Sequence, residues 1–495
     1  MRYCVLGVVG LMAGIVAFWY GGPTSSNDIP VGIVIPHHDM VAPARAAYVA
    51  NVAKNYQPKT IILLAPDHFS QNTKPIVTTS RVWHTSLGEL TSNKSLITEL
   101  GIPEQDSAFD GEHAVTTLLQ DLKQYFPKAE LVPFMLSRRA TYQEVTNFVA
   151  HLYRACPECL VVASVDFSHT TTATVAALHD DFTLRELTAV NPSALYKNAE
   201  VDSPETLAAL AQWGYLHDAN EFKLFSHTNS GFLTHRAVGE MTTHIIGGYY
   251  KGSAKPQFAD QVTLMIGGEA SVTPTTRTIG STNIDALIKT NLGERFFWGV
   301  DAALIKRIQN PSQSAPLYKY PRDILPAQIY TQGSTKVVVL SIDPQESLAE
   351  SVTAVARYQA AGYRVILYIQ NPLADIDRTI MTKWAETLID AGANLVIGNE
   401  SDTPRIGAVY KGVPIIYSLG IFLNVTSTSA TRSLGTIVGV RVTINGLELF
   451  LVPIHTFQVP TVVPQAEYID YLAEWTEPWS EYATDRQTYL FPFTK

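Results

Sequence analysis

Histidine and aspartate stand close behind three apolar runs of the sequence. The runs cover 31–36, 60–66 and 160–165, and the polar residues that follow them include His37, His68, Asp166 and His169. Continuous apolar runs of this length are typical of strands that are buried on both faces of a parallel sheet. Because parallel strands open their carboxyl ends onto one crevice, we expect these four side chains to converge there.

Two of these histidines are of the type that binds a transition metal. Neutral imidazoles suit iron, copper and zinc, and two histidines with one carboxylate form the facial site of non-haem iron(II) enzymes. We therefore predict that His37 and His68 hold one metal ion, with iron or copper favoured over zinc. The third ligand is open between three carboxylates, which are Asp166, Glu112 and Asp202. Asp202 precedes a predicted helix from about Thr206 and could equally be its N-cap.

Two further histidines suit proton transfer better than metal binding. His113 directly follows Glu112, and His169 stands three residues after Asp166. An imidazole without a metal titrates near neutral pH and can act as a general acid or base. We therefore assign catalytic roles to His169, Asp166, His113 and Glu112 around the ion.

Predicted helices lie between the strands. Apolar residues recur at helical spacing over 42–55 and 115–126. Alternation of strand and helix predicts right-handed βαβ units and a parallel sheet. After a polar stretch at 251–260, buried strands and helices alternate again. We thus expect two α/β domains, over 29–250 and 261–495, and the first has a mainly parallel sheet.

The composition excludes some classes of partner. The 495 residues include 45 acidic and 36 basic ones, which gives a net charge of −9, and no cluster of Lys and Arg is present. A nucleic-acid partner is therefore not expected, because phosphate binding needs a basic face. Cys156 and Cys159 form a C-x-x-C pair before the third strand. Outside the cytoplasm this pair predicts a small local disulfide, with a redox role as the alternative.

The first 28 residues predict a membrane-targeting segment and a polar linker. Tyr3 to Tyr20 carry no charge, and Gly21-Gly22-Pro23 follow. The length is compatible with a signal-anchor and with a long signal peptide. We favour an uncleaved anchor because Phe18, Trp19 and Tyr20 occupy the place of a small-residue cleavage site. The remaining chain would then lie outside the cytoplasm, in the cell envelope, or be secreted if the segment is cleaved.

Four motifs carry a family resemblance. They are Pro36-His37, Pro66-Asp67-His68, Asp110-Gly111-Glu112-His113 and Ser164-Val165-Asp166-Phe167-Ser168-His169, in this order. Together they resemble the Memo-like family, also called AmmeMemoRadiSam system protein B, over about residues 29–250. The resemblance implies a fold similar to class III extradiol ring-cleaving dioxygenases.

The resemblance also implies a set of site residues. His37 and His68 match the two metal-binding histidines of the family, and Asp166 and His169 match the polar pair beside the metal. By order along the chain, Asp202 falls near the third ligand, which is often a cysteine in the family. A thiolate favours copper whereas a carboxylate favours the harder iron(II), so this departure bears on the metal's identity.

A second resemblance concerns the later half of the chain. Residues 388–398 and 409–422 resemble the CapA-type domain of poly-γ-glutamate capsule synthesis, a family similar to calcineurin-like metallophosphatases. The resemblance covers about 261–455. Positions where relatives carry metal-binding residues hold other residues here, which are Gly268-Glu269, Gln370-Asn371-Pro372, Gly398 to Pro404 and Ile421. Apart from His455, no histidine follows His244. The resemblance therefore implies a domain that has lost metal chemistry and serves as a scaffold or polymer-binding surface.

Three functions are compatible with these observations. We favour an exported mononuclear metalloenzyme that performs redox or dioxygenase-type chemistry on a small molecule. A metal-dependent hydrolase could use the same residues, and a non-catalytic envelope protein that binds polymers could use both domains. The fold alone does not choose between them, because one architecture hosts unrelated functions.

Overall fold

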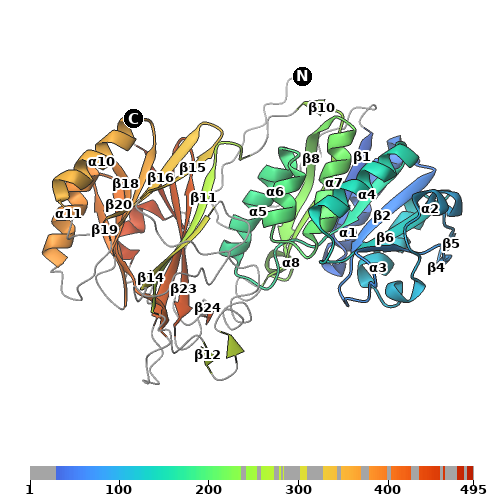
Figure 1. Cartoon of the computed structure of the whole chain (residues 1–495), viewed down its shortest axis with the longest axis horizontal. Helices are drawn as coiled ribbons and strands as arrows, with labels where there is room; N and C mark the ends of the chain where they lie inside the picture. Colours follow the sequence, from blue (N-terminus) through green and yellow to red (C-terminus); the bar gives the residue numbers. More distant parts are fainter. Residues whose placement is uncertain are drawn as a thin grey trace. The chain divides into compact units, whose positions relative to one another are not determined.

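The computed structural model of the chain describes two α/β units (Figure 1). The described residues are 29–235, 241–253, 258–271, 278–279, 282–283, 302–308, 327–342, 347–369, 378–398, 403–424, 434–456, 461–462, 476–483 and 488–493. The units divide between Ala259 and Asp260. Both contain parallel strands and helices, which confirms the predicted α/β class.

The predicted membrane segment, residues 3–20, lies outside the described residues. Within the part of the chain that the structure describes, no helix is both long enough and apolar enough to span a bilayer.

An eight-stranded sheet forms the middle of the N-terminal unit, in the order β10-β8-β9-β1-β7-β2-β6-β3. Its four central strands run parallel, and they are β1 (Pro30–Ile35), β7 (Leu160–Ser164), β2 (Thr60–Pro66) and β6 (Glu130–Leu136). Antiparallel partners flank them, namely β9 (Thr243–Tyr250) beside β1, β8 (Ala219–Asn229) beside β9, and β3 (Ile76–Thr78) beside β6. The short β10 (Gly252–Ser253) pairs in parallel with β8. The sheet is therefore parallel at its centre and mixed at its edges.

Helices cover both faces of this sheet. The bounds are α1 (Ala42–Asn55), α2 (Lys94–Leu100), α3 (His113–Tyr125), α4 (Tyr142–Ala155), α5 (Ala173–Thr188), α6 (Pro192–Asn198), α7 (Pro204–Leu216) and α8 (Ser230–Leu233). A small hairpin of β4 (Trp83–Thr85) and β5 (Gly88–Leu90) and two 3₁₀ helices, Asp39–Val41 and Asp106–Phe109, complete the unit.

The alternation of side chains along β1 explains why its sequence is apolar throughout. Ile33 packs into the cluster formed with α1 and α3, whereas Val34 packs into the cluster formed with α4 and α7. Successive side chains of a strand point to opposite faces, so a strand covered on both sides must be apolar at every position. The same alternation holds in β2, where Ile61 and Ile62 belong to opposite clusters.

The C-terminal unit contains two larger sheets. A seven-stranded sheet comprises β11 (Val262–Ser271), β14 (Ala302–Ile308), β21 (Ile421–Asn424), β22 (Leu434–Val442), β23 (Gly446–His455), β24 (Thr461–Val462) and β25 (Thr488–Pro492). A six-stranded sheet comprises β15 (Ala327–Gln332), β16 (Thr335–Ile342), β17 (Arg364–Ile369), β18 (Ala393–Ile397), β20 (Val413–Leu419) and β19 (Pro404–Tyr410), in that order. One apolar cluster joins the two sheets. On its other face the six-stranded sheet packs against α10 (Leu348–Ala360) and α11 (Arg378–Asp390) (Figure 1).

Several positions that bear on chemistry in this unit lie outside the described residues. They are Gln370-Asn371-Pro372 and residues 399–402. The short pairs β12 (Thr278–Ile279) and β13 (Thr282–Asn283) and the 3₁₀ helix Glu477–Tyr482 are the remaining described elements.

A graded truncation in β2 tests the two-faced burial of the central strands. Ile62 is fully buried. We expect Ile62→Ala to lower the free energy of unfolding by about 2–5 kcal/mol and Ile62→Val by about 0.5–1.5 kcal/mol, because a cavity adds to the lost transfer energy. Urea unfolding followed by circular dichroism measures both, and equal midpoints for the two variants and the wild type would contradict the assigned burial.

Candidate metal centre

His37 follows β1 and points its ring toward the end of β7. The residue is 3% exposed, and Nδ1 of its ring lies 3.0 Å from the hydroxyl of Ser164. That hydroxyl donates its one proton to the carbonyl of Ala114 at 2.7 Å. Ser164 must therefore accept the second hydrogen bond from His37 Nδ1–H, which leaves the lone pair on Nε2.

Arg45 fixes the loop that carries this histidine. Its guanidinium donates to the carbonyl oxygens of Pro36 and His38, at 3.1 and 3.4 Å, and pairs with Asp121 of α3 at 2.7 Å. The buried arginine thus ties both backbone neighbours of His37 to a helix.

His68, behind β2, is oriented by a buried carboxylate. Its Nδ1 lies 2.9 Å from Glu112 Oε1, and its backbone N–H donates to Glu112 Oε2 at 3.1 Å. Glu112 also accepts from the N–H of Ala114 and caps α3, which therefore begins at His113, two residues earlier than predicted. With Nδ1–H given to this carboxylate, His68 also presents a lone pair on Nε2.

Asp202 is free for the site because its neighbour caps the helix. The hydroxyl of Ser203 accepts the N–H of Thr206 and caps α7, so of the two roles that the sequence left open for Asp202, the helix N-cap is wrong. Asp202 Oδ2 lies 3.3 Å from His37 Nε2 and 3.5 Å from His68 Nε2. Its loop is tied to that of Asp166, since the N–H of each donates to the other, at 3.1 and 3.2 Å.

The donor spacing fits a single ion. Two ligands that each bind an ion at 2.0–2.2 Å in tetrahedral geometry lie about 3.4 Å apart. The separations of Asp202 Oδ2 and Asp166 Oδ2 from His37 Nε2 are 3.3 and 3.4 Å. In the tautomer given above, His37 Nε2 is a hydrogen-bond acceptor, as are the two carboxylate oxygens. Acceptors cannot bond to one another, but a cation between them would bind all three. The second oxygens of Asp166 and Asp202 are buried without a hydrogen-bond partner.

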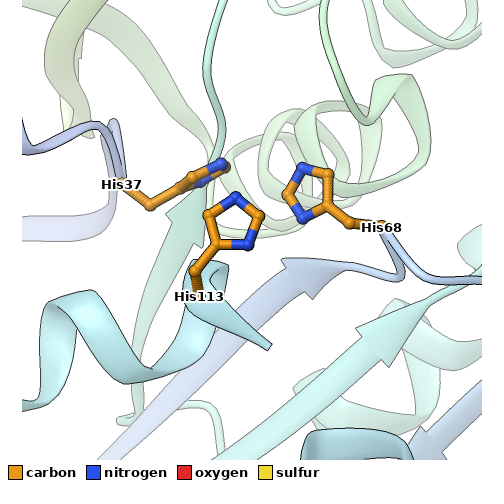
Figure 2. A group of neighbouring side chains, drawn as sticks. All are labelled: His37, His68 and His113. Carbon is orange, nitrogen blue, oxygen red and sulfur yellow. The ribbon is translucent and has the colours of Figure 1, made fainter. Parts of the chain in front are cut away.

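The ring of His113 lies beside those of His37 and His68 (Figure 2). Its ring stacks on that of His68, with centroids 4.4 Å apart, and meets the ring of His37 edge-on at 5.1 Å. Its side chain is 51% exposed, and its Nδ1 lies 3.4 Å from Glu112 Oε1. His37 therefore belongs to two overlapping groups that could hold an ion, one with His68 and His113 and one with Asp166 and Asp202.

The neighbouring charges set the protonation of the site. Burial lowers the pKa of His37 despite the attraction of Asp202 and Asp166. Burial would also lower the pKa of His68, but hydrogen bonds with Asp202 and Glu112 outweigh it and raise that pKa to about 9. Burial alone would raise the pKa of Asp166, but His244, His37 and His169 outweigh burial and hold it well below its ordinary value. A proton on His68 thus takes the role of a cation when no ion is bound.

The predicted residues are therefore placed in three ways. The structure brings His37 together with Asp166 and Asp202 in one group and with His68 and His113 in another, and His68 Nε2 lies 3.5 Å from Asp202 Oδ2. Glu112 is fully buried behind His68. His169 acts on Asp166 through its charge, and its backbone N–H donates to the buried Glu200 at 3.1 Å.

His244 is a site residue that the sequence analysis missed. It is fully buried, and its Nδ1 lies 3.7 Å from Asp166 Oδ1. The carboxyl ends of parallel strands predict His37, His68 and Asp166, but His244 does not follow such an end. The strand β9 runs antiparallel to β1, so His244 near its beginning reaches the edge where β1 ends. The signal in the sequence that could have predicted His244 is a histidine at the start of a strand that pairs antiparallel with a central strand.

Comparisons with known proteins identify two families. Residues 13–241 match the Memo-like protein family, and residues 331–426 match the bacterial capsule synthesis protein family PGA_cap. A MEMO1 family protein from Pyrobaculum arsenaticum is 27% identical over 179 residues, which cover 34% of this chain and 64% of the relative. A MEMO1 family protein from Caldivirga maquilingensis is 25% identical over 170 residues, covering 30% and 58%. The chain thus spans less than two thirds of the length of these two relatives.

A solved structure of a novel phosphatase from Mycoplasma pneumoniae aligns with 40% of this chain and 96% of its own, at 8% identity and a TM-score of 0.27.

Removing the hydroxyl of Ser164 tests whether it orients His37. We expect Ser164→Ala to weaken Co²⁺ binding 10- to 100-fold, the usual loss when a partner behind a ligating histidine is removed. Ser137→Ala is the matched control, because Ser137 is a buried serine just beyond β6 that contacts Arg139 instead. Isothermal titration calorimetry gives both affinities, and an unchanged affinity in Ser164→Ala would show that the hydroxyl does not orient the ring.

Proposed function

The chain carries a Memo-like domain at residues 13–241, and from this premise we propose that its N-terminal unit is a mononuclear metal centre for redox or dioxygenase-type chemistry on a small molecule. The observation that carries the proposal is the convergence of two imidazole Nε2 atoms on one buried carboxylate oxygen. Hydrogen bonds behind both rings hold them so that those nitrogens are aimed at the same point.

In this proposal His37, His68 and Asp202 hold the ion. Two histidines and one carboxylate are the ligand set of non-haem iron(II) sites, so iron is the favoured metal, with copper and zinc as alternatives. When bound, such an ion supplies a Lewis acid and a redox centre with open positions for small molecules. Asp166 stands beside these ligands, with one carboxylate oxygen 3.4 Å from His37 Nε2.

We assign proton transfer to His113 and His169. The ring of His113 is half exposed, so it can exchange protons with solvent while Glu112 lies 3.4 Å from its Nδ1 and orients it. His169 lies on the side of Asp166, whose pKa it helps to lower.

We further propose an extracytoplasmic location with a membrane anchor at residues 3–20. The uncharged run in the sequence supports the anchor. Cys156 and Cys159 form a disulfide, and disulfides persist in oxidising compartments. In this location the anchored chain would meet small molecules and polymers of the cell envelope.

For the C-terminal unit we propose a non-catalytic scaffold that binds an envelope polymer. Its match to the capsule synthesis family supports a polymer ligand. The presence of His455 alone after His244 supports the loss of metal chemistry, since imidazole is a principal ligand of transition metals.

Metal analysis of the purified full-length protein tests the proposed centre. We expect about one iron per chain in the wild type, because the site offers a facial set of three ligands, and a loss of that iron in both His37→Ala and His68→Ala. His84→Ala is the control, because its side chain is 76% exposed on the hairpin. Inductively coupled plasma mass spectrometry counts the metal. If the wild type held no metal, only the function as a non-catalytic, polymer-binding envelope protein would remain. If it held zinc alone, the proposed redox chemistry would be contradicted.

Changing the carboxylate ligand to a thiolate tests the role of Asp202. We expect Asp202→Cys to retain a metal but to shift its preference from iron(II) toward copper(I), because soft thiolates select copper. Competition between the two ions, read as metal per chain, measures the shift. The same iron-to-copper ratio in Asp202→Cys and wild type would mean that residue 202 does not touch the metal.

A further inference from the structure

The two carboxylate oxygens of Asp166 face different histidines. Oδ2 lies 3.4 Å from His37 Nε2, within the centre described above, and Oδ1 lies 3.7 Å from His244 Nδ1. The residues are 3% and 0% exposed. Oδ1 and both ring nitrogens of His244 are buried without a hydrogen-bond partner.

These unpaired atoms are costly to bury unless something lies between them. A buried polar atom that has left water without a new partner destabilises the fold, and such atoms in native structures point to an unseen water or ion. Their separation exceeds hydrogen-bond length. Two ligands that bind one ion at about 2.1 Å lie about 3.0–3.7 Å apart, depending on the angle between them, so Oδ1 and Nδ1 fit one shared ion.

The charge of the pocket also favours a second cation. Asp166, Asp202 and Glu112 are three buried carboxylates, and within the described residues their ion pairs are all with histidine. With neutral imidazoles, a single divalent ion leaves a negative charge in a buried place. Carboxylates that bridge two divalent ions are a known solution to this imbalance in two-metal sites.

His38 lies against this position without being assigned as a ligand. Its ring centroid is 5.1 Å from that of His244. Its Nδ1 accepts the backbone N–H of Met40 at 3.3 Å, so the neutral ring carries its proton on Nε2. It can therefore donate a hydrogen bond to a water or anion beside His244.

We propose that Asp166 bridges two cation positions, and that Asp166 Oδ1 and His244 Nδ1 hold a second divalent transition ion. This proposal rests on the proposed function, because the first position is the centre at His37, His68 and Asp202. With two protein ligands instead of three, the second position binds more weakly and fills when the ion is added in excess. Ions that accept mixed nitrogen and oxygen ligands, such as Mn²⁺, Co²⁺ and Zn²⁺, are the class that fits.

A Co²⁺ titration of the detergent-solubilised full-length chain tests the second position. By equilibrium dialysis we expect two Co²⁺ per wild-type chain, one tight and one weaker, and one in His244→Leu. The control is His217→Leu, which removes another histidine with an unpaired ring nitrogen, in a cavity beside Pro30 at the opposite end of β1. That variant should still bind two.

The outcomes separate this proposal from the proposed function. One Co²⁺ in both the wild type and His244→Leu, lost in His37→Ala, would overturn the second position and leave the first. A wild type that binds none would overturn both.

A spectroscopic measurement on the wild type covers the case in which His244→Leu fails to fold. With Mn²⁺ in excess we expect an electron paramagnetic resonance signal of a spin-coupled pair. The signal of isolated Mn²⁺ alone would show that a water or a proton, and not an ion, satisfies Asp166 Oδ1 and His244.

Discussion

The structure of the N-terminal unit depends on holding one buried carboxylate opposite two imidazole lone pairs. Asp202 Oδ2 and the Nε2 atoms of His37 and His68 all accept hydrogen bonds, so they attract one another only through a cation or a proton. Their positions are fixed from behind, by Ser164 and by Glu112. Ser164 and Glu112 are themselves buried. They hold the Nδ1 proton of each ring, so neither ring can move its proton to Nε2 and relieve the repulsion between Nε2 and the carboxylate. The polar parts of this centre are thus built around a positive charge.

The order of the strands decides which residues can meet at this point. The strands β1 and β2 follow one another in the sequence, yet β7 pairs with both and lies between them. The loop after β7 therefore places Asp166 between the loops that carry His37 and His68. Asp166 then fixes Asp202 in two ways: its carbonyl oxygen accepts the Asp202 N–H, and its own N–H donates to the Asp202 carboxylate. Because β7 lies about a hundred residues after β2 in the sequence, the site forms only when these distant strands have paired in the sheet.

The α/β class and the gathering of histidines at one sheet edge followed from the sequence because both depend on local patterns. Apolar runs mark strands covered on both faces, and their ends mark the edge. The cap of α7 could not be predicted, because Asp202 and Ser203 are both good caps and only tertiary contacts select the serine. His244 was missed because it lies near the start of an antiparallel strand. The roles of His113 and His169 and the membrane segment stay predictions.

The C-terminal unit shows that the fold and the chemistry have separate causes. Its strands β16, β17, β18 and β20 are also parallel neighbours, with helices on one face and a second sheet on the other. The same burial rule therefore builds both sheets. The donors differ, because His455 is the one histidine of the C-terminal unit, whereas two histidines and two aspartates meet beyond the strand ends of the N-terminal unit. The burial of apolar strands fixes where the residues at the strand ends lie. Whether those residues need a cation depends only on whether they are metal-binding side chains such as histidine and aspartate.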